Sequence, residues 1–327
     1  MWAINKHLFF FYLCVWHNVP IVSVKGFMIQ KIMVLCFATS MLYSCNNQQA
    51  SNTQTTTESK LNPEQDSTFA QDTASVANAR PAITYTQVIK KDSINRYIKA
   101  ADTNSLKIIA AINRADVKFL KRFDTIVVPS DLSLEMKYYF PFPLEAPFLA
   151  QVKKIIFFSY PTQSFAAYEN GRLVYTGPTS MGRKKDMTPT GLFYTNWKAE
   201  ETISTFNDEW KLKWNFNIEN KLGVGFHQYE MPGYPASHSC LRLTENDAKD
   251  LYGWADQWTI KGTDNILAQG TPVIVFGSYA FGNSRPWRAL AQNANALDIS
   301  VQDLESVSTL YLPDIMQKQE KRDKIKK

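Results

Sequence analysis

The sequence predicts a mainly β domain at residues 150–277, a sandwich or open barrel with one or two helices. A small α+β module precedes it and a helical tail follows it. Short apolar runs alternate with turn signals in this region, and few of its segments have helical spacing. The chain has 327 residues and is 45% hydrophobic, which is enough for a core and too apolar for a wholly disordered chain.

Residues 1–44 have the pattern of a signal peptide, with a lysine, an apolar run and small or polar residues in front of Cys45. Leu42-Tyr43-Ser44-Cys45 resembles the lipobox of bacterial lipoproteins. We therefore expect Cys45 to be lipidated and to anchor the chain to a membrane of the cell envelope, facing the periplasm. Ordinary signal cleavage and a retained anchor stay open as alternatives, and Met28 is a candidate for the true initiator.

Residues 45–82 form the lipidated cysteine and a tether rich in Gln, Asn, Thr, Ser and Ala. Such a segment has too few large apolar side chains to offset its ordering entropy, so we expect it to be flexible.

Residues 83–130 form the small α+β module, and residues 131–149 a Pro-containing connector. The module is weakly similar to the peptidoglycan-binding LysM repeat. The similarity lies in a predicted helix, the pair Ile112-Asn113, and then a turn and a strand that ends at Pro129. The interpretation we prefer is a structural helix–strand cap on the next domain.

Several elements of residues 150–277 can be placed from local signals. Asn170-Gly171 between two apolar runs predicts a tight hairpin. A strand is expected to end at His227. Thr244 is a good N-cap for a helix that runs through Trp254 to Trp258.

The residue pattern of 278–327 predicts a helical, basic extension that ends in Lys-Arg-Asp-Lys-Ile-Lys-Lys. We expect a solvated tail, with a contact to anionic envelope polymers as the alternative.

Charge and cysteine content exclude two classes of protein. The formal net charge is +6, but no Lys/Arg-rich patch interleaved with aromatic residues indicates nucleic-acid binding. Four cysteines are too few for a disulfide framework.

Reactive residues concentrate in one short segment. Once the signal peptide is removed, the two histidines His227 and His238 and the one unlipidated thiol, Cys240, lie within fourteen residues. A thiol attacks carbonyls only as thiolate, and a nearby imidazole can take its proton. The sequence puts Cys240 just before a predicted helix N-terminus, where backbone N–H groups stabilise an anion. Arg242 adds positive charge and could hold a substrate carboxylate.

Other interpretations of these residues stay open at this point. Cys240 could be an inert buried thiol, and either histidine could be structural. His227, His238 and Cys240 could also bind zinc, although no signature such as HExxH accompanies them.

At these residues the chain resembles the L,D-transpeptidase catalytic domain, the YkuD family. That family carries S-H-G-C-[IV]-R, and this chain has Ser237-His238-Ser239-Cys240-Leu241-Arg242. Val224-Gly225-Phe226-His227 matches the strand that carries the family's upstream histidine. Thr188-Pro189-Thr190-Gly191 and the hairpin at Asn170-Gly171 also fit, so the resemblance covers about 150–277.

The resemblance implies a β-rich L,D-transpeptidase fold and a role for each matched residue. Cys240 would be the nucleophile, His227 the general base and acid, and His238 a neighbour of the thiol. Family members cleave peptidoglycan tetrapeptide stems through a thioester and pass the acyl group to an amine, which gives a 3-3 cross-link. They need no cofactor, and we expect no metal.

We expect the substrate contacts at residues around the nucleophile: Arg242, Ser239, Ser237, Tyr229 and Tyr234. Ser239 stands where the family has glycine. If that position needs a positive φ, the serine must adopt it at some cost.

The sequence thus predicts a peptidoglycan L,D-transpeptidase in a cell-envelope lipoprotein. Its transfer to an amine would give a 3-3 cross-link or attach a protein, its partners are stem peptides, and its oligomeric state stays unknown. One alternative is an L,D-carboxypeptidase or hydrolase that uses the same Cys-His site, because only the acceptor differs. Another is a catalytically silent peptidoglycan-binding lipoprotein in which the 83–130 module does the binding.

Overall fold

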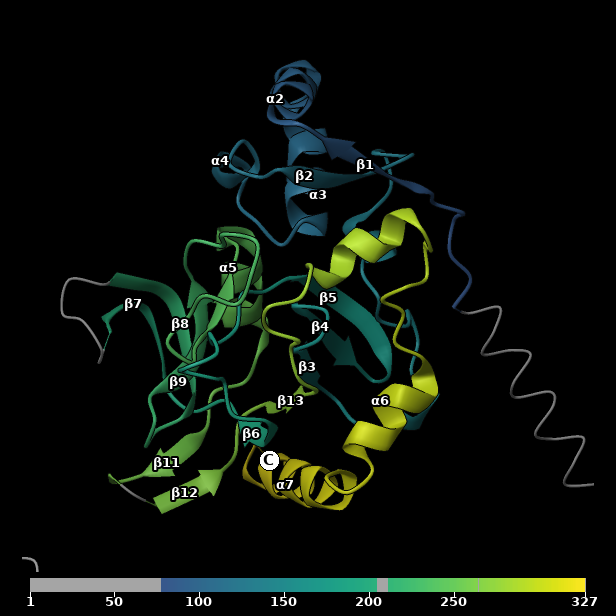
Figure 1. The fold of residues 1–327 in the computed structure, drawn as a ribbon. Coiled ribbons are helices and arrows are strands. Elements are labelled where there is room, and N and C mark those ends of the chain that lie inside the picture. The colour runs from purple at the N-terminus through teal and green to yellow at the C-terminus, as the bar shows by residue number, and fades with distance from the viewer. Residues whose placement is uncertain (1–77, 205–210, 264, 327) are drawn as a thin grey trace, which may run out of the picture. The chain divides into compact units, whose positions relative to one another are not determined.

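The computed structural model describes residues 78–204, 211–263 and 265–326 (Figure 1). The predicted signal peptide, the predicted lipidation site Cys45 and nearly all of the predicted tether lie outside these ranges. Within them, no helix combines the length and the apolar character needed to cross a bilayer.

The N-terminal module is a two-stranded antiparallel sheet with three helices between its strands. Its strands are β1 (Tyr85–Ile89) and β2 (Thr125–Pro129), and its helices are α2 (Lys91–Ala100), α3 (Thr103–Ile112) and α4 (Val117–Leu120). Asp102 caps α3 by accepting from the backbone N–H groups of Asn104 and Ser105. The buried Asn113 amide ties α3 to β2, because it donates to the Val127 carbonyl and accepts from the Val127 N–H. The expected α+β character is confirmed.

A five-stranded mixed sheet forms the centre of the fold, in the order β5-β4-β3-β13-β6. Its strands are β5 (Arg172–Pro178), β4 (Ser164–Glu169), β3 (Ile155–Ser159), β13 (Pro272–Phe276) and β6 (Gly191–Tyr194). The central pair β3 and β13 is parallel, and the other pairs are antiparallel. Asn170 and Gly171, with φ of 49° and 79°, make the predicted hairpin between β4 and β5.

A four-stranded sheet in the order β10-β9-β8-β7 carries the reactive residues. Its strands are β7 (Lys198–Ile203), β8 (Lys211–Glu219), β9 (Val224–Gln228) and β10 (Leu241–Leu243). Helix α5 (Glu245–Trp254) follows β10, and Thr244 is its N-cap as predicted. The predicted extension of this helix to Trp258 is wrong, because α5 ends at Trp254 and β11 (Thr259–Lys261) then pairs with β12 (Asn265–Ala268).

One hydrophobic core fills the space between the two larger sheets and α5. Alternate residues of β3, such as Ile156 and Phe158, meet Phe216 of β8 and Phe226 of β9, all fully buried. Three short 3₁₀ helices complete the connections: η1 (Met136–Tyr139), η2 (Pro147–Leu149) and η3 (Pro286–Ala291).

The other face of the five-stranded sheet is covered by the C-terminal extension. Ile299, Leu304 of α6 (Val301–Ser308) and Ile315 of α7 (Leu312–Lys326) pack against Phe157 and Ile274. The expectation of a solvated tail is therefore wrong, since β3 and β13 are apolar on both faces and need a cover on each. The mainly β expectation holds for the two larger sheets, while the described chain as a whole is mixed α/β.

Candidate active site

Strands β9 and β10 lie side by side and bring His227 and Cys240 near one another. The two strands are parallel, and His227 is the register partner of Arg242. Cys240 directly precedes β10 and lies two residues before Arg242 in the chain. Because parallel strands need a crossover, residues 229–240 form a loop that leaves β9 and returns beside it.

The two residues line one small cavity of about 20 Å³, roughly the space of one water molecule. The residues around it come from β8, β9, β10, the position directly after β7 and the loop that joins β9 to β10: Ser204, Leu212, His227, Tyr229, Ser237, His238, Cys240 and Arg242. This set includes His227 and five other residues that were predicted for catalysis or substrate contact.

Burial keeps the Cys240 thiol protonated at rest. Burial raises the pKa of this thiol, while a hydrogen bond from the Gly225 backbone and the charge of Arg242 act in the opposite direction. Its Sγ lies 3.7 Å from the Gly223 carbonyl oxygen. The expected thiolate stabilisation by a helix N-terminus is wrong, because β10 separates Cys240 from α5.

His227 is poised as a neutral base. It is 3% exposed, and burial lowers its pKa to about 4. Its Nδ1 lies 2.9 Å from the Gln228 carbonyl oxygen, so Nδ1 donates there and Nε2 is left with a free lone pair. The group that orients the His227 ring is therefore a backbone carbonyl.

The turn in front of Cys240 is strained. Ser239 has a φ of +79°, the conformation anticipated for the position where the family has glycine, and such a backbone costs about 1–3 kcal/mol in a non-glycine residue. The Ser237 hydroxyl donates to the Cys240 carbonyl at 2.5 Å, and Thr188 Oγ1 donates to the Ser239 carbonyl at 2.8 Å. These two bonds hold the turn, and Ser237 is only 1% exposed.

His238 is held from outside the predicted motif. Its Nδ1 lies 3.2 Å from Nη2 of Arg183 and 3.6 Å from Oδ2 of Asp186. Burial, together with the Arg183 charge, lowers its pKa. Sequence reasoning missed Arg183 and Asp186, because no spacing connects them to a residue some fifty positions away.

Arg242 organises the polar side of the cavity. Its guanidinium stacks 4.5 Å from the centre of the Tyr229 ring, and its Nη1 donates to the Glu230 carbonyl at 3.1 Å. Of the predicted contact residues, Ser239 and Tyr234 do not line the cavity. Tyr234 faces solvent instead. It is 49% exposed, and its carbonyl accepts from the Ser180 hydroxyl.

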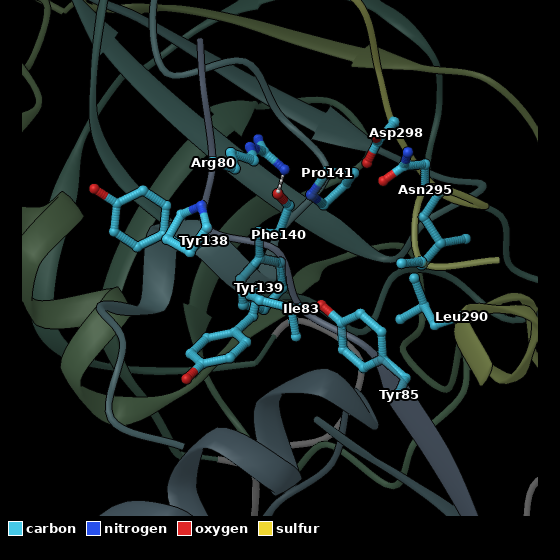
Figure 2. Close-up of a pocket in the computed structure, with 13 residues that line it drawn as sticks. Arg80, Ile83, Tyr85, Tyr138, Tyr139, Phe140, Pro141, Leu290, Asn295 and Asp298 are labelled. Carbon is cyan, nitrogen blue, oxygen red and sulfur yellow. Dashed lines mark hydrogen bonds between the residues drawn. The ribbon is translucent and has the colours of Figure 1, made fainter. Parts of the chain in front are cut away.

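A second cavity, of about 60 Å³, contains none of the predicted site residues. Figure 2 shows it between Tyr85 of β1, the segment around Phe140 and the C-terminal residues Leu290, Asn295 and Asp298. Arg80 donates there to the Phe140 carbonyl at 2.7 Å.

Across the described ranges, no group of three or more His, Cys, Asp or Glu side chains is placed to hold a metal ion, so the zinc alternative has no ligand set there.

Residues 153–275 match the model of the YkuD family, the L,D-transpeptidase catalytic domain. No curated protein matches the chain. Among solved structures, an L,D-transpeptidase from Stackebrandtia nassauensis is 22% identical with a TM-score of 0.32, and the match covers 39% of this chain and 57% of that one. The catalytic domain of the Enterococcus faecium enzyme is 25% identical with a TM-score of 0.29, over 38% of this chain and 98% of that one.

An L,D-transpeptidase from Mycobacterium tuberculosis is 21% identical with a TM-score of 0.31, over 38% of this chain and 58% of that one. This chain therefore spans less than two thirds of the first of these solved structures. The family assignment rests on the family model. The matched residues include every strand of the two larger sheets, except the last residue of β13, and they include His227 and Cys240. Residues 153–275 of this chain are therefore identified as a YkuD-type L,D-transpeptidase catalytic domain.

Proposed function

We propose that this chain is a peptidoglycan L,D-transpeptidase that uses Cys240 as its nucleophile. The observation that carries the proposal is that Cys240 and the neutral, oriented His227 line the same cavity. A protonated thiol beside a neutral imidazole is a pair that becomes reactive when a carbonyl arrives, because the proton can move as the sulfur attacks.

In the first half-reaction, Cys240 Sγ attacks the carbonyl of the third residue of a tetrapeptide stem. The thiol proton passes to His227 Nε2, and a C–S bond forms. The C–N bond to the terminal D-Ala then breaks, and the proton is delivered from His227 to the leaving amine. The turn at Ser239 fits a role in presenting backbone N–H groups to the oxyanion.

In the second half-reaction, an amine of a neighbouring stem attacks the thioester. A C–N bond forms, the C–S bond breaks, and the proton lost by the amine returns to Cys240 through His227. Arg242 is suited to bind a carboxylate of the donor stem, since its guanidinium lines the cavity and is held by Tyr229 and Glu230.

The family acts on the cell wall, so the site works outside the cytoplasm. We further propose that the lipid on Cys45 anchors the chain to a membrane and that the tether lets the catalytic domain reach the sacculus.

Intact-protein mass spectrometry tests the nucleophile. The full-length chain is incubated with a tetrapeptide-stem muropeptide, with and without an amine acceptor, beside Cys240→Ala as the control. We expect an acyl adduct on the wild type only, and 3-3 linked dimers when acceptor is present. Shortened stems without dimers would point to the carboxypeptidase alternative. A folded wild-type chain without any adduct would contradict the proposal and favour the silent binding protein.

A further inference from the structure

We propose that the turn between α3 and α4 is a clamp that sets the conformation of the loop joining His227 to Cys240, which makes the N-terminal module part of the donor-binding site. We call residues 113–118 the clamp turn and residues 229–236 the site loop. This inference rests on the proposed function, since it assigns a positioning role within the same reaction.

A single residue of the clamp turn binds both backbone polar groups of one residue of the site loop. The backbone N–H of Asp116 donates to the Met231 carbonyl at 2.9 Å. In return, the Met231 N–H donates to Oδ2 of Asp116 at 3.0 Å. The neighbouring Ala115 forms an isolated antiparallel bridge with Pro232. The two segments are therefore paired like strands although they lie more than a hundred positions apart in the chain.

The site loop also approaches the module too closely for a side chain. Gly233 has a φ of +85°, and a Cβ placed there would lie 2.5 Å from Cζ of Phe123 and 3.3 Å from the Asn113 carbonyl oxygen. Phe123 is covered on another side by the guanidinium of Arg285, 4.1 Å from the ring centre. Glycine is thus required by both the backbone conformation and the packing.

The clamp turn is held in place by the contacts of Arg114, so it can position the site loop. Arg114 has a φ of +56° and is 1% exposed. Its Nε donates to the Thr162 carbonyl at 2.8 Å, across to the five-stranded sheet domain. Its guanidinium lies over the rings of Phe140 and Trp287, at 4.7 and 5.5 Å. A positive φ and a buried cation are both costly, which indicates that the surrounding contacts strongly determine this conformation.

The opposite edge of the site loop leads directly to the catalytic cavity. The Glu230 carbonyl, next to Met231, accepts from Arg242, and Arg242 stacks on Tyr229. Both Arg242 and Tyr229 line the cavity around Cys240. A shift of Met231 away from Asp116 would therefore move two cavity-lining side chains without touching Cys240 or His227.

The clamp predicts a loss that depends on the acyl donor. In the full-length chain, we expect Asp116→Ala to reduce the kcat/KM of Cys240 acylation by the tetrapeptide stem at least tenfold, mainly through a higher KM. Alkylation of Cys240 by iodoacetamide, measured by peptide mapping, should stay within about twofold, because that reagent needs no donor site. Asp116→Asn keeps an oxygen acceptor for the Met231 N–H and should retain most of the wild-type rate.

Asp102→Ala is the matched control in the same module. It removes the N-cap of α3 and lowers the stability of the module without touching the site loop. Hydrogen exchange at the Met231 amide should accelerate in Asp116→Ala and not in Asp102→Ala. If Asp116→Ala does not fold, Gly233→Ala should show the same donor-specific loss.

The proposal is overturned if Asp116→Ala acylates like the wild type, or if Asp102→Ala loses as much activity as Asp116→Ala. A wild-type chain that is never acylated would instead contradict the proposed function. The exchange rate of the Met231 amide would still decide whether the clamp exists.

Discussion

His227 Nδ1 lies 2.9 Å from the carbonyl oxygen of its own neighbour, Gln228. The contact fixes the tautomer and leaves Nε2 as the basic atom in a buried cavity that also contains the Cys240 thiol. Burial lowers the pKa of His227 to about 4 and raises that of Cys240. The resting pair is therefore neutral, and it does not form a thiolate–imidazolium ion pair.

The neutral pair predicts how thiol reactivity depends on pH. Because the pKa of Cys240 is raised, the rate of its alkylation by iodoacetamide should keep increasing as the pH rises to 9 and beyond. Stopped-flow or quenched alkylation with peptide mapping measures this profile. A plateau of full reactivity already present at pH 6 to 7 would show an ion pair and contradict the assignment.

Replacing His227 should separate acylation from simple thiol reactivity. We expect His227→Gln to lower the rate of stem acylation by about 10²–10⁴-fold, because no group then accepts the thiol proton during attack. Alkylation at high pH, where the thiolate forms without help, should persist. Equal acylation by His227→Gln and wild type would remove His227 from the mechanism.

The buried carboxyl of Asp247 predicts a pH-dependent stability. Burial raises the pKa of this carboxyl from its ordinary value of 3.8 to about 7, against the opposing hydrogen bond from Thr244. A raised pKa means that this stabilisation is complete below pH ~4 and is lost as the pH rises through about 7. The free energy of unfolding should fall by on the order of 2–4 kcal/mol over that range, because one pKa unit corresponds to about 1.4 kcal/mol.

Asp247→Asn should remove that decline, and Glu245→Gln on the same helix is the matched control. Urea unfolding at a series of pH values gives both profiles. An unchanged pH profile in Asp247→Asn would show that another group causes the decline.

Glycine at position 239 should relieve the strain in front of Cys240. The φ of +79° at Ser239 is costly for an L-residue and free for glycine. We expect Ser239→Gly to raise the free energy of unfolding by about 1 kcal/mol, after the larger chain entropy of glycine is subtracted. Thermal and urea unfolding measure the change, and a clear loss of stability would contradict the backbone argument.

The C-terminal extension should behave as part of the core. Ile315 of α7 is 1% exposed, so Ile315→Ala should cost about 2–5 kcal/mol of folding free energy. Ile325 on the same helix is 42% exposed, and Ile325→Ala should change stability by less than about 0.5 kcal/mol. Equal effects of the two substitutions in urea unfolding would mean that α7 does not cover the sheet in solution.

Local signals in the sequence predicted local structure well. Asn170-Gly171 predicted the β4–β5 hairpin, and Thr244 predicted the start of α5, because both depend on the backbone preferences of a few neighbouring residues. The clustering of His227 and Cys240 pointed to the cavity that both residues line. Their catalytic roles stay predictions.

Features that depend on distant packing could not be predicted in this way. Strand β10 has only three residues, too few to show a period, so the sequence suggested a helix N-terminus beside Cys240. The charged residues at the end of the C-terminal extension led to the prediction of a solvated tail, although apolar residues of the same extension cover β3. The contact between Asp116 and Met231 and the pair formed by Arg183 and His238 join segments with no shared sequence pattern.

The central claim is that Cys240 carries the acyl group, and intact-protein mass spectrometry of the full-length chain with a tetrapeptide-stem muropeptide tests it most directly. We predict a mass increase equal to the stem minus D-Ala on the wild type, which peptide mapping places on Cys240 and which is absent in Cys240→Ala. An unmodified wild-type chain that is folded, or an adduct that survives in Cys240→Ala, would contradict the account.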